Sequence, residues 1–240
     1  MDTVVEVEGL EKRYGDLRAV DGVSLSVARG EVYGVLGPNG AGKTTTVECI
    51  AGLRSPDGGR VRVLGLDPAA DAAGVRAVVG VQLQQAALPD RLRVGEALRV
   101  FASAYGRRDQ VDGLLADWGL ADKRRAAFAT LSGGQRQRLF IALALLGDPE
   151  IVVLDELTTG LDPAARRDTW ALVRRLREAG TTVLLVTHAM DEAAALCDRL
   201  AVIVGGRLAA AGTPAEVTGG HSSLEEAYLA LTDASLEVTV

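Results

Sequence analysis

Hydrophobic and polar residues alternate in two stretches near the N-terminus, residues 4–10 and residues 23–27. A period of two is typical of strands that bury one face and expose the other, so the pattern predicts a pair of half-exposed antiparallel strands. A further strand over residues 31–36 leads into a glycine-rich segment, residues 37–42, and a helix is expected to follow through about Ala51.

Later strands are expected from apolar runs without alternation. Residues 151–154 and 182–186 are continuous runs, which is typical of strands buried on both faces of a parallel sheet. Further strands are expected at residues 61–64, 77–83 and 200–204, the last followed by a Gly205-Gly206 hairpin turn into residues 207–211. Helices are expected at residues 132–146, 163–178 and 189–196 and, as two short helices, in the tail over residues 213–231.

Residues 90–127 have a different character, because their apolar side chains follow helical spacing. Val94, Leu98 and Phe101 recur at intervals of three or four residues, and a second set begins at Val111. We therefore expect a helical lobe at this point of the chain. With 240 residues and no repeat or low-complexity linker, the chain is expected to form one large α/β domain.

Composition narrows the class of protein. Aromatic residues make up only 4% of the chain, so Val, Leu and Ala must form the core, which suits an α/β protein with parallel strands. The 26 basic and 32 acidic residues give a net charge of −6, which argues against direct nucleic-acid binding, because that needs a clustered basic face.

Cys49 and Cys197 lie far apart and predict a reducing compartment without disulfides. We expect neither a signal peptide nor a membrane span, since the longest apolar run covers only residues 139–146.

A complete phosphate-binding motif, G-x-x-x-x-G-K-[ST], occupies the glycine-rich segment. It consists of Gly37, Pro38, Asn39, Gly40, Ala41, Gly42, Lys43 and Thr44, with Thr45 directly after it. Its glycines allow backbone N–H groups to surround phosphate oxygens, and the helix that follows points its positive end at the same anion. Lys43 is expected to reach the outer phosphates, and the Thr44 hydroxyl to coordinate Mg²⁺. The motif therefore predicts a site for Mg-ATP.

Two acidic residues, Asp155 and Glu156, follow the buried run at residues 151–154. Parallel α/β sheets place ligand sites at the carboxyl ends of their strands, so both side chains are expected near the phosphate loop. Asp155 is expected to hold Mg²⁺ or its waters, and Glu156 to polarise the attacking water as general base. Acidic strand ends are common, but combined with the phosphate loop this one indicates ATP hydrolysis.

A third motif points to a protein family. Leu131-Ser132-Gly133-Gly134-Gln135 resembles the signature motif of ATP-binding-cassette (ABC) ATPases and, as in that family, opens a helix shortly before the acidic strand. The resemblance extends over nearly the whole chain and implies roles for single residues. It implies adenine stacking for Tyr14, contact with Mg²⁺ and the membrane partner for Gln84, a D-loop that ends at Asp162, and γ-phosphate contact for His188.

The resemblance also implies a fold and an assembly. The fold would be a P-loop NTPase core with a parallel sheet, an N-terminal antiparallel β subdomain, an inserted helical subdomain at about residues 90–147 and a short helical tail at about residues 213–240. The helix that starts at Ser132 offers N–H donors to an anion, and in the family this end contacts ATP held by a second subunit. Ser132 and Asp162 also suit simple helix caps. The implied assembly is a homodimer that sandwiches two ATP molecules, peripheral to the cytoplasmic face of the cell membrane and bound to integral permease subunits.

Details of the motifs are similar to those of the drug- and antibiotic-efflux branch of the family. Leu157 stands where many relatives have proline, residues 82–85 lack the proline that often precedes the key glutamine, and residues 223–231 resemble the ending of that branch. The resemblance thus implies export.

A soluble ABC ATPase of a non-transport complex, acting in cofactor assembly or on nucleic acid, is the alternative. A third hypothesis is a structural subunit with a dead site, against which Lys43 and Glu156 argue.

Overall fold

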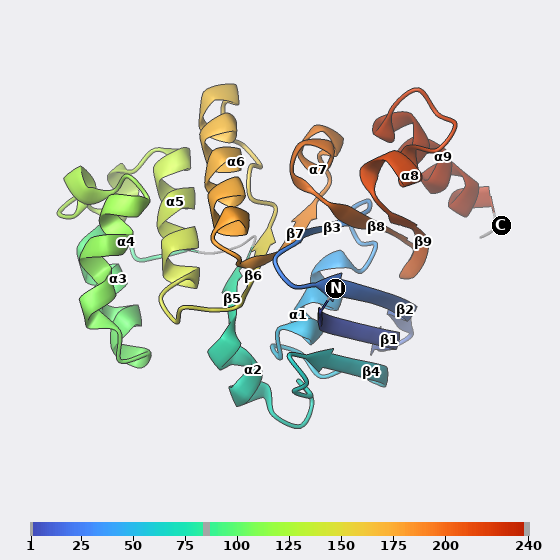
Figure 1. Ribbon diagram of the computed structural model, residues 1–240, viewed down its shortest axis with the longest axis horizontal. Coiled ribbons are helices and arrows are strands. Elements are labelled where there is room, and N and C mark those ends of the chain that lie inside the picture. Colours follow the sequence, from blue (N-terminus) through green and yellow to red (C-terminus); the bar gives the residue numbers. More distant parts are fainter. Residues whose placement is uncertain (1, 84–86, 238–240) are drawn as a thin grey trace.

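The computed structural model describes residues 2–83 and 87–237, and their strands form two sheets (Figure 1). The smaller sheet is antiparallel, in the order β2-β1-β4, and consists of β1 (Thr3–Tyr14), β2 (Leu17–Ala28) and β4 (Gly58–Val63). In β1, Val5 and Val7 are buried whereas Glu6 and Glu8 are exposed. The predicted pair of half-exposed antiparallel strands is therefore confirmed.

The larger sheet has six strands in the order β5-β6-β7-β3-β8-β9. They are β3 (Val32–Leu36), β5 (Val79–Gln82), β6 (Ile151–Asp155), β7 (Thr182–Thr187), β8 (Arg199–Val204) and β9 (Arg207–Gly212). Neighbours pair in parallel except β8 and β9, which form the predicted hairpin. Because β6, β7 and β3 are adjacent, their carboxyl ends bring the residues that follow them to one edge of the sheet.

Alternate residues of the parallel strands face two different cores. In β6, Val152 and Leu154 pack with the helical part of the chain, whereas Ile151 and Val153 pack with residues of the antiparallel sheet. All five residues of β6 are buried. Cover on both faces is the reason why these strands are continuous apolar runs rather than alternating ones.

The helices flank the sheets, and two groups of them form the two ends of the molecule (Figure 1). They are α1 (Lys43–Ile50), α2 (Ala72–Val78), α3 (Val94–Ala104), α4 (Val111–Asp117), α5 (Gly133–Ala144), α6 (Pro163–Glu178), α7 (Met190–Leu196), α8 (Pro214–Thr218) and α9 (Leu224–Glu237). In Figure 1, α3, α4 and α5 form one end of the molecule beside α6, and α8 and α9 lie at the other. None of the described helices is long and apolar enough to cross a membrane.

Two predicted elements differ from the structure. The strand expected at residues 77–83 is shorter, because residues 77 and 78 complete the helix α2. The side chain of Asp71 starts this helix by accepting a hydrogen bond from the Gly74 N–H at 2.8 Å, and Val75 fixes it to the core. In the tail, α9 is longer than expected and runs to Glu237.

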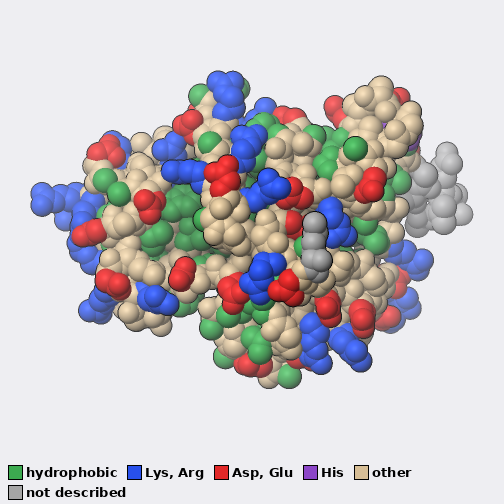
Figure 2. Space-filling model, in the orientation of Figure 1, with side chains coloured by type: hydrophobic (Ala, Val, Ile, Leu, Met, Phe, Trp, Pro, Cys, Tyr) green, Lys and Arg blue, Asp and Glu red, His purple; other side chains and the backbone are tan. Residues whose placement is uncertain are grey.

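The surface carries both charges in close mixture on the face shown in Figure 2, where acidic and basic side chains are interspersed. Exposed ion pairs are also formed among the described residues, such as Arg29 with Glu150 at 2.6 Å. Cys49 and Cys197 are both buried and unbridged, as their separation in the sequence predicted.

Candidate functional site

The phosphate loop connects β3 to α1 and lies against two other strands. Gly42 caps α1 with a φ of 98°, and a Cβ on it would lie 2.1 Å from the carbonyl oxygen of Ala19. A Cβ on Gly37 would meet the carbonyl oxygen of Ile203 at the same distance. Both positions therefore need glycine, because any side chain would drive the loop away from β2 and β8.

Lys43 lies beneath this loop rather than in solvent. Its side chain is 6% exposed, and its ammonium donates hydrogen bonds to the carbonyl oxygens of Gly37 at 2.8 Å and Pro38 at 2.9 Å. Burial lowers the pKa of Lys43, while the charges of Glu156 and Asp155 act in the opposite direction. The ammonium is thus held in the curve of the loop by these two bonds.

Asp155 and Thr44 together form a small set of oxygen donors. The Thr44 hydroxyl donates to Oδ2 of Asp155 at 3.0 Å, which confirms that the carboxyl end of β6 faces the loop. Asp155 is fully buried, and its Oδ1 has no hydrogen-bond partner among the described residues. Burial raises the pKa of Asp155, and the bond from Thr44 opposes that rise. A buried carboxylate oxygen without a partner beside a hydroxyl fits a hard cation such as Mg²⁺, which takes oxygen ligands.

Glu156 and His188 meet at the ends of β6 and β7. His188 Nδ1 lies 3.2 Å from Glu156 Oε1, with the His188 side chain 48% exposed and that of Glu156 8% exposed. The backbone of Glu156 has a φ of +50°, unusual for a residue with a side chain, and its N–H donates to the carbonyl oxygen of Val186 at 2.8 Å. The turn directs the carboxylate toward the phosphate loop.

A cavity of about 440 Å³ lies over the loop, and Asp155 and His188 are not among the described residues that line it. It is lined by Tyr14, Leu17, Ala19, Asn39, Gly40, Ala41, Gly42, Lys43, Thr44, Thr45 and Glu156. Tyr14 is 40% exposed at its rim, and the guanidinium of Arg54 lies 5.2 Å from the ring centre. The sequence did not point to Leu17 and Ala19, which reach the cavity because the β1–β2 hairpin returns beside Tyr14.

The signature segment caps a helix and lies beside the next one. Ser132 Oγ accepts from the Gln135 N–H at 3.3 Å, and Gln135 Oε1 accepts from the Ser132 N–H at 3.0 Å. A Cβ on Gly133 would lie 3.3 Å from Leu161, and one on Gly134 3.2 Å from Ala165, so this segment adjoins the D-loop and α6. Among the described residues, those that line the phosphate-loop cavity include none of residues 132–135.

Asp162 caps α6 as the sequence allowed. Its carboxylate accepts hydrogen bonds from the N–H groups of Ala164 at 2.9 Å and Ala165 at 3.0 Å, and these bonds lower its pKa. Gln84 lies outside the described residues. Its neighbour Gln82, 4% exposed at the end of β5, donates to the carbonyl oxygen of Leu83 at 2.8 Å.

The capping role of Ser132 leads to a prediction for the chain without nucleotide. Replacing Ser132 with alanine removes the side-chain acceptor and is expected to lower the free energy of unfolding by about 1 kcal/mol. Urea denaturation of the two chains measures this difference. Ser132→Asn keeps a capping oxygen and is the matched control, which should stay near the wild-type value. An equal loss in both variants would show that the cap does not carry the effect.

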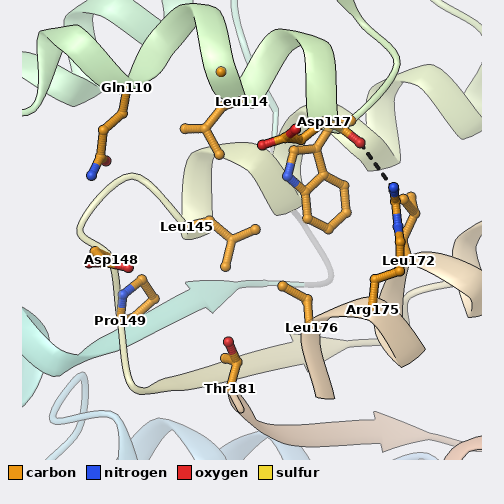
Figure 3. Close-up of a pocket in the computed structure, with 12 residues that line it drawn as sticks. Gln110, Leu114, Asp117, Leu145, Asp148, Pro149, Leu172, Arg175, Leu176 and Thr181 are labelled. Carbon is orange, nitrogen blue, oxygen red and sulfur yellow. Dashed lines mark hydrogen bonds between the residues drawn. The ribbon is translucent and has the colours of Figure 1, made fainter. Parts of the chain in front are cut away.

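A second cavity, of about 490 Å³, lies between α4, α6 and the segment after α5 (Figure 3). Its apolar lining includes Leu114, Leu145 and Leu172, and the Arg175 guanidinium at its edge donates to the carbonyl oxygen of Asp117 at 3.0 Å. None of the residues for which the sequence predicts a role in binding or catalysis is among the described residues that line this cavity. It forms a seam between two groups of helices, separate from the phosphate loop.

Known proteins resemble this chain over most of its length. The family model described as ABC transporter matches residues 20–159, which contain the phosphate loop, the signature segment and both acidic residues. The daunorubicin resistance ATP-binding protein DrrA3 of Streptomyces coeruleorubidus is 47% identical over 227 residues, which cover 91% of this chain and 72% of that protein. The Nod factor export ATP-binding protein I of Ralstonia nicotianae is 45% identical over 219 residues, covering 89% of this chain and 68% of that protein.

The fold also matches solved structures. A chain described as the ATP binding subunit of an ABC transporter is 30% identical in sequence and superposes with a TM-score of 0.84. The superposition covers 95% of this chain and 99% of the other. The similarity therefore includes both sheets and the helices around them.

Proposed function

The chain belongs to the ABC transporter family, and we propose that it is the ATP-hydrolysing subunit of an exporter whose pathway lies in separate membrane subunits. The observation that carries this proposal is the grouping of Lys43, Thr44, Asp155 and Glu156 around one loop. Two similar proteins are named for daunorubicin resistance and for Nod factor export, which supports export as the direction of transport.

The residues around the loop fit Mg-ATP. Lys43 and the N–H groups of residues 40–45 would hold the phosphates, while Thr44 and Asp155 offer the oxygens suited to Mg²⁺, with Gln84 as a further proposed ligand. Bound Mg²⁺ would neutralise charge on the phosphates. Tyr14, at the cavity rim, is exposed enough to stack on adenine.

Hydrolysis in this proposal depends on the pair formed by Glu156 and His188. The Glu156 carboxylate accepts a proton from the attacking water and so raises its nucleophilicity. His188 lies within hydrogen-bonding distance of that carboxylate and so orients the carboxylate. The imidazole ring of His188 is exposed and is available to contact the γ-phosphate. Both side chains come from adjacent strand ends, so the sheet fixes the distance between them.

A homodimer would complete the site. The N-terminus of α5, with its donors at residues 132–135, adjoins the D-loop and not the cavity of the same chain. A helix N-terminus attracts anions, so we propose that it contacts the ATP held by a second copy. Two copies in a two-fold arrangement would then contribute half of each site, with Asp162 near the interface.

The membrane partner is proposed to dock beside α3. A cavity of about 340 Å³ there is lined by apolar residues that include Leu88, Phe101 and Tyr105. Phe101 and Tyr105 are 43% and 47% exposed, more than usual for such large side chains. A short helix of the permease would cover them, and the complex would lie at the cytoplasmic face of the membrane.

Two measurements test this function. The purified chain is expected to release phosphate from ATP only when Mg²⁺ is present, and EDTA should abolish the release. Purification of a tagged chain from its native cells should bring along an integral membrane protein. Recovery of a stable complex with soluble proteins alone would contradict the transport role and favour a soluble ABC ATPase. Failure to bind Mg-ATP would remove the proposed function altogether.

A further inference from the structure

Glu192, on α7, is a fully buried carboxylate that does not line the phosphate-loop cavity. Its side chain is 0% exposed. Oε1 accepts two hydrogen bonds, from the Thr158 hydroxyl at 2.9 Å and from the indole N–H of Trp170 at 3.0 Å. Oε2 is buried and has no hydrogen-bond partner among the described residues. An apolar side chain here would leave the Thr158 hydroxyl and the Trp170 indole N–H without this acceptor, so the carboxylate serves to hold these two donors.

The two donors connect Glu192 to the segments that carry the proposed site. Thr158 follows Glu156 by two residues and directly precedes the D-loop, residues 159–162. Glu192 itself lies four residues after His188, within the first turn of α7. The bond between Thr158 and Glu192 therefore joins the chain just beyond Glu156 to the helix just beyond His188.

Trp170 adds the third segment, α6. This helix is capped by Asp162, so the bond from its indole ties the helix after the D-loop to α7. A second link between the two helices, Arg166 with Asp191 at 2.8 Å, is an ion pair between side chains that are 36% and 51% exposed. Exposed pairs contribute little, so the buried carboxylate is the stronger connection.

The backbone at Glu156 explains why such a connection matters. A φ of +50° is disfavoured for a residue with a Cβ, and such a conformation persists only where the surroundings hold it. On one side the Glu156 N–H is bonded to Val186. On the other side, Leu157 is buried and Thr158 is fixed by Glu192. Loss of the second attachment would let the turn relax and move the Glu156 carboxylate away from His188.

We propose that Glu192 is a positioning residue for ATP hydrolysis. By accepting the hydrogen bond from the Thr158 hydroxyl, it fixes the position of the Glu156 carboxylate relative to His188 and to the D-loop. The inference rests on the proposed function, because it assumes that Glu156 acts on the attacking water. The D-loop also contacts the pair directly, because the Thr159 hydroxyl donates to Glu156 Oε2 at 3.4 Å, so a displacement of residues 159–162 on dimer closure would act on Glu156 as well.

The test compares Thr158→Val with Thr158→Ser in the full chain. Valine has nearly the shape of threonine but lacks the donor, and we expect kcat for Mg-ATP to fall about tenfold, with KM within about twofold, because a small displacement of a reacting group is costly while the binding cavity is untouched. Serine keeps the hydroxyl and should restore kcat. Glu192→Gln keeps an acceptor oxygen and should retain most of kcat, whereas Glu192→Ala should lose it.

A readout without nucleotide accompanies the kinetics. The N–H groups of Thr159 and Leu161 donate to the carbonyl oxygens of Glu156 and Thr158, so their hydrogen exchange reports on the turn. Thr158→Val should accelerate exchange at these two positions and leave β6 unchanged. Trp170→Phe is the matched control, because it removes the other hydrogen bond to the same oxygen and should leave kcat within about twofold of wild type.

The results separate this inference from the function on which it rests. Wild-type kcat in Thr158→Val, or an equal fall in Thr158→Val and Trp170→Phe, would overturn the role of Glu192 while hydrolysis by the wild-type chain stands. A wild-type chain that fails to hydrolyse Mg-ATP would overturn both. If Glu192→Ala does not fold, the Thr158 pair, which keeps the carboxylate, still decides.

Discussion

Replacing Glu156 with glutamine is expected to lower kcat for ATP hydrolysis by about 10²- to 10³-fold, because a general base contributes a rate factor of this order. Glutamine has the same shape and keeps an oxygen that accepts a hydrogen bond from His188. It cannot accept a proton from water near neutral pH. Since Lys43, Thr44 and Asp155 are unchanged, the affinity for Mg-ATP should stay within about twofold of wild type. Single-turnover phosphate release and equilibrium nucleotide binding measure the two quantities.

The same variant should accumulate as an ATP-bound dimer. If closure of two copies depends on ATP and opening on hydrolysis, a chain that binds without hydrolysing remains closed. Sedimentation with and without Mg-ATP would show the change in mass, and EDTA should reverse it. Glu178→Gln, at the exposed end of α6, is the matched control and should behave as wild type. Brisk hydrolysis by Glu156→Gln would remove this residue from the role of base.

The parallel sheet could be predicted from the sequence because strands that are buried on both faces consist of continuous apolar runs. The runs at residues 151–154 and 182–186 are apolar throughout, and the structure buries β6 and β7 on both faces. The helix α2 has no such recognisable pattern in the sequence. Only Val75 among its residues is buried, and a short alanine-rich segment has no periodicity that would distinguish it from a loop.

The candidate site, too, could be predicted only in part from the sequence. The phosphate loop could be predicted because its glycines, lysine and threonine are contiguous, and local backbone geometry dictates them. The pairing of Thr44 with Asp155 could be expected only from the rule that strand ends converge. Glu192 could not be identified, because a glutamate in the first turn of a helix ordinarily faces solvent. Its burial depends on Trp170 and Thr158, which lie 22 and 34 residues away in the sequence.

Lys43→Ala is expected to raise the dissociation constant for ATP by at least about tenfold, since hydrogen bonds between charged groups are worth roughly 1.5–3 kcal/mol. In the structure Lys43 is 6% exposed, and its ammonium donates hydrogen bonds to the carbonyl oxygens of Gly37 and Pro38. It is therefore already placed for a phosphate and need not be ordered on binding. Equilibrium binding of a fluorescent ATP analogue, competed with ATP, gives the constant directly.

The same burial means that alanine also removes packing, so a second variant is needed to isolate the charge. Lys43→Met keeps most of the stem under the loop but lacks the donors, and it should lose affinity as much as Lys43→Ala while unfolding closer to the wild-type temperature. Lys123→Ala, at a partly exposed lysine that pairs with Asp122, is the control for charge and should bind ATP normally. Unchanged affinity in Lys43→Met would mean that the backbone of the loop binds the phosphates without the ammonium. In that case the lysine would serve to shape the loop through Gly37 and Pro38, and the assignment of its charge to the nucleotide would fail.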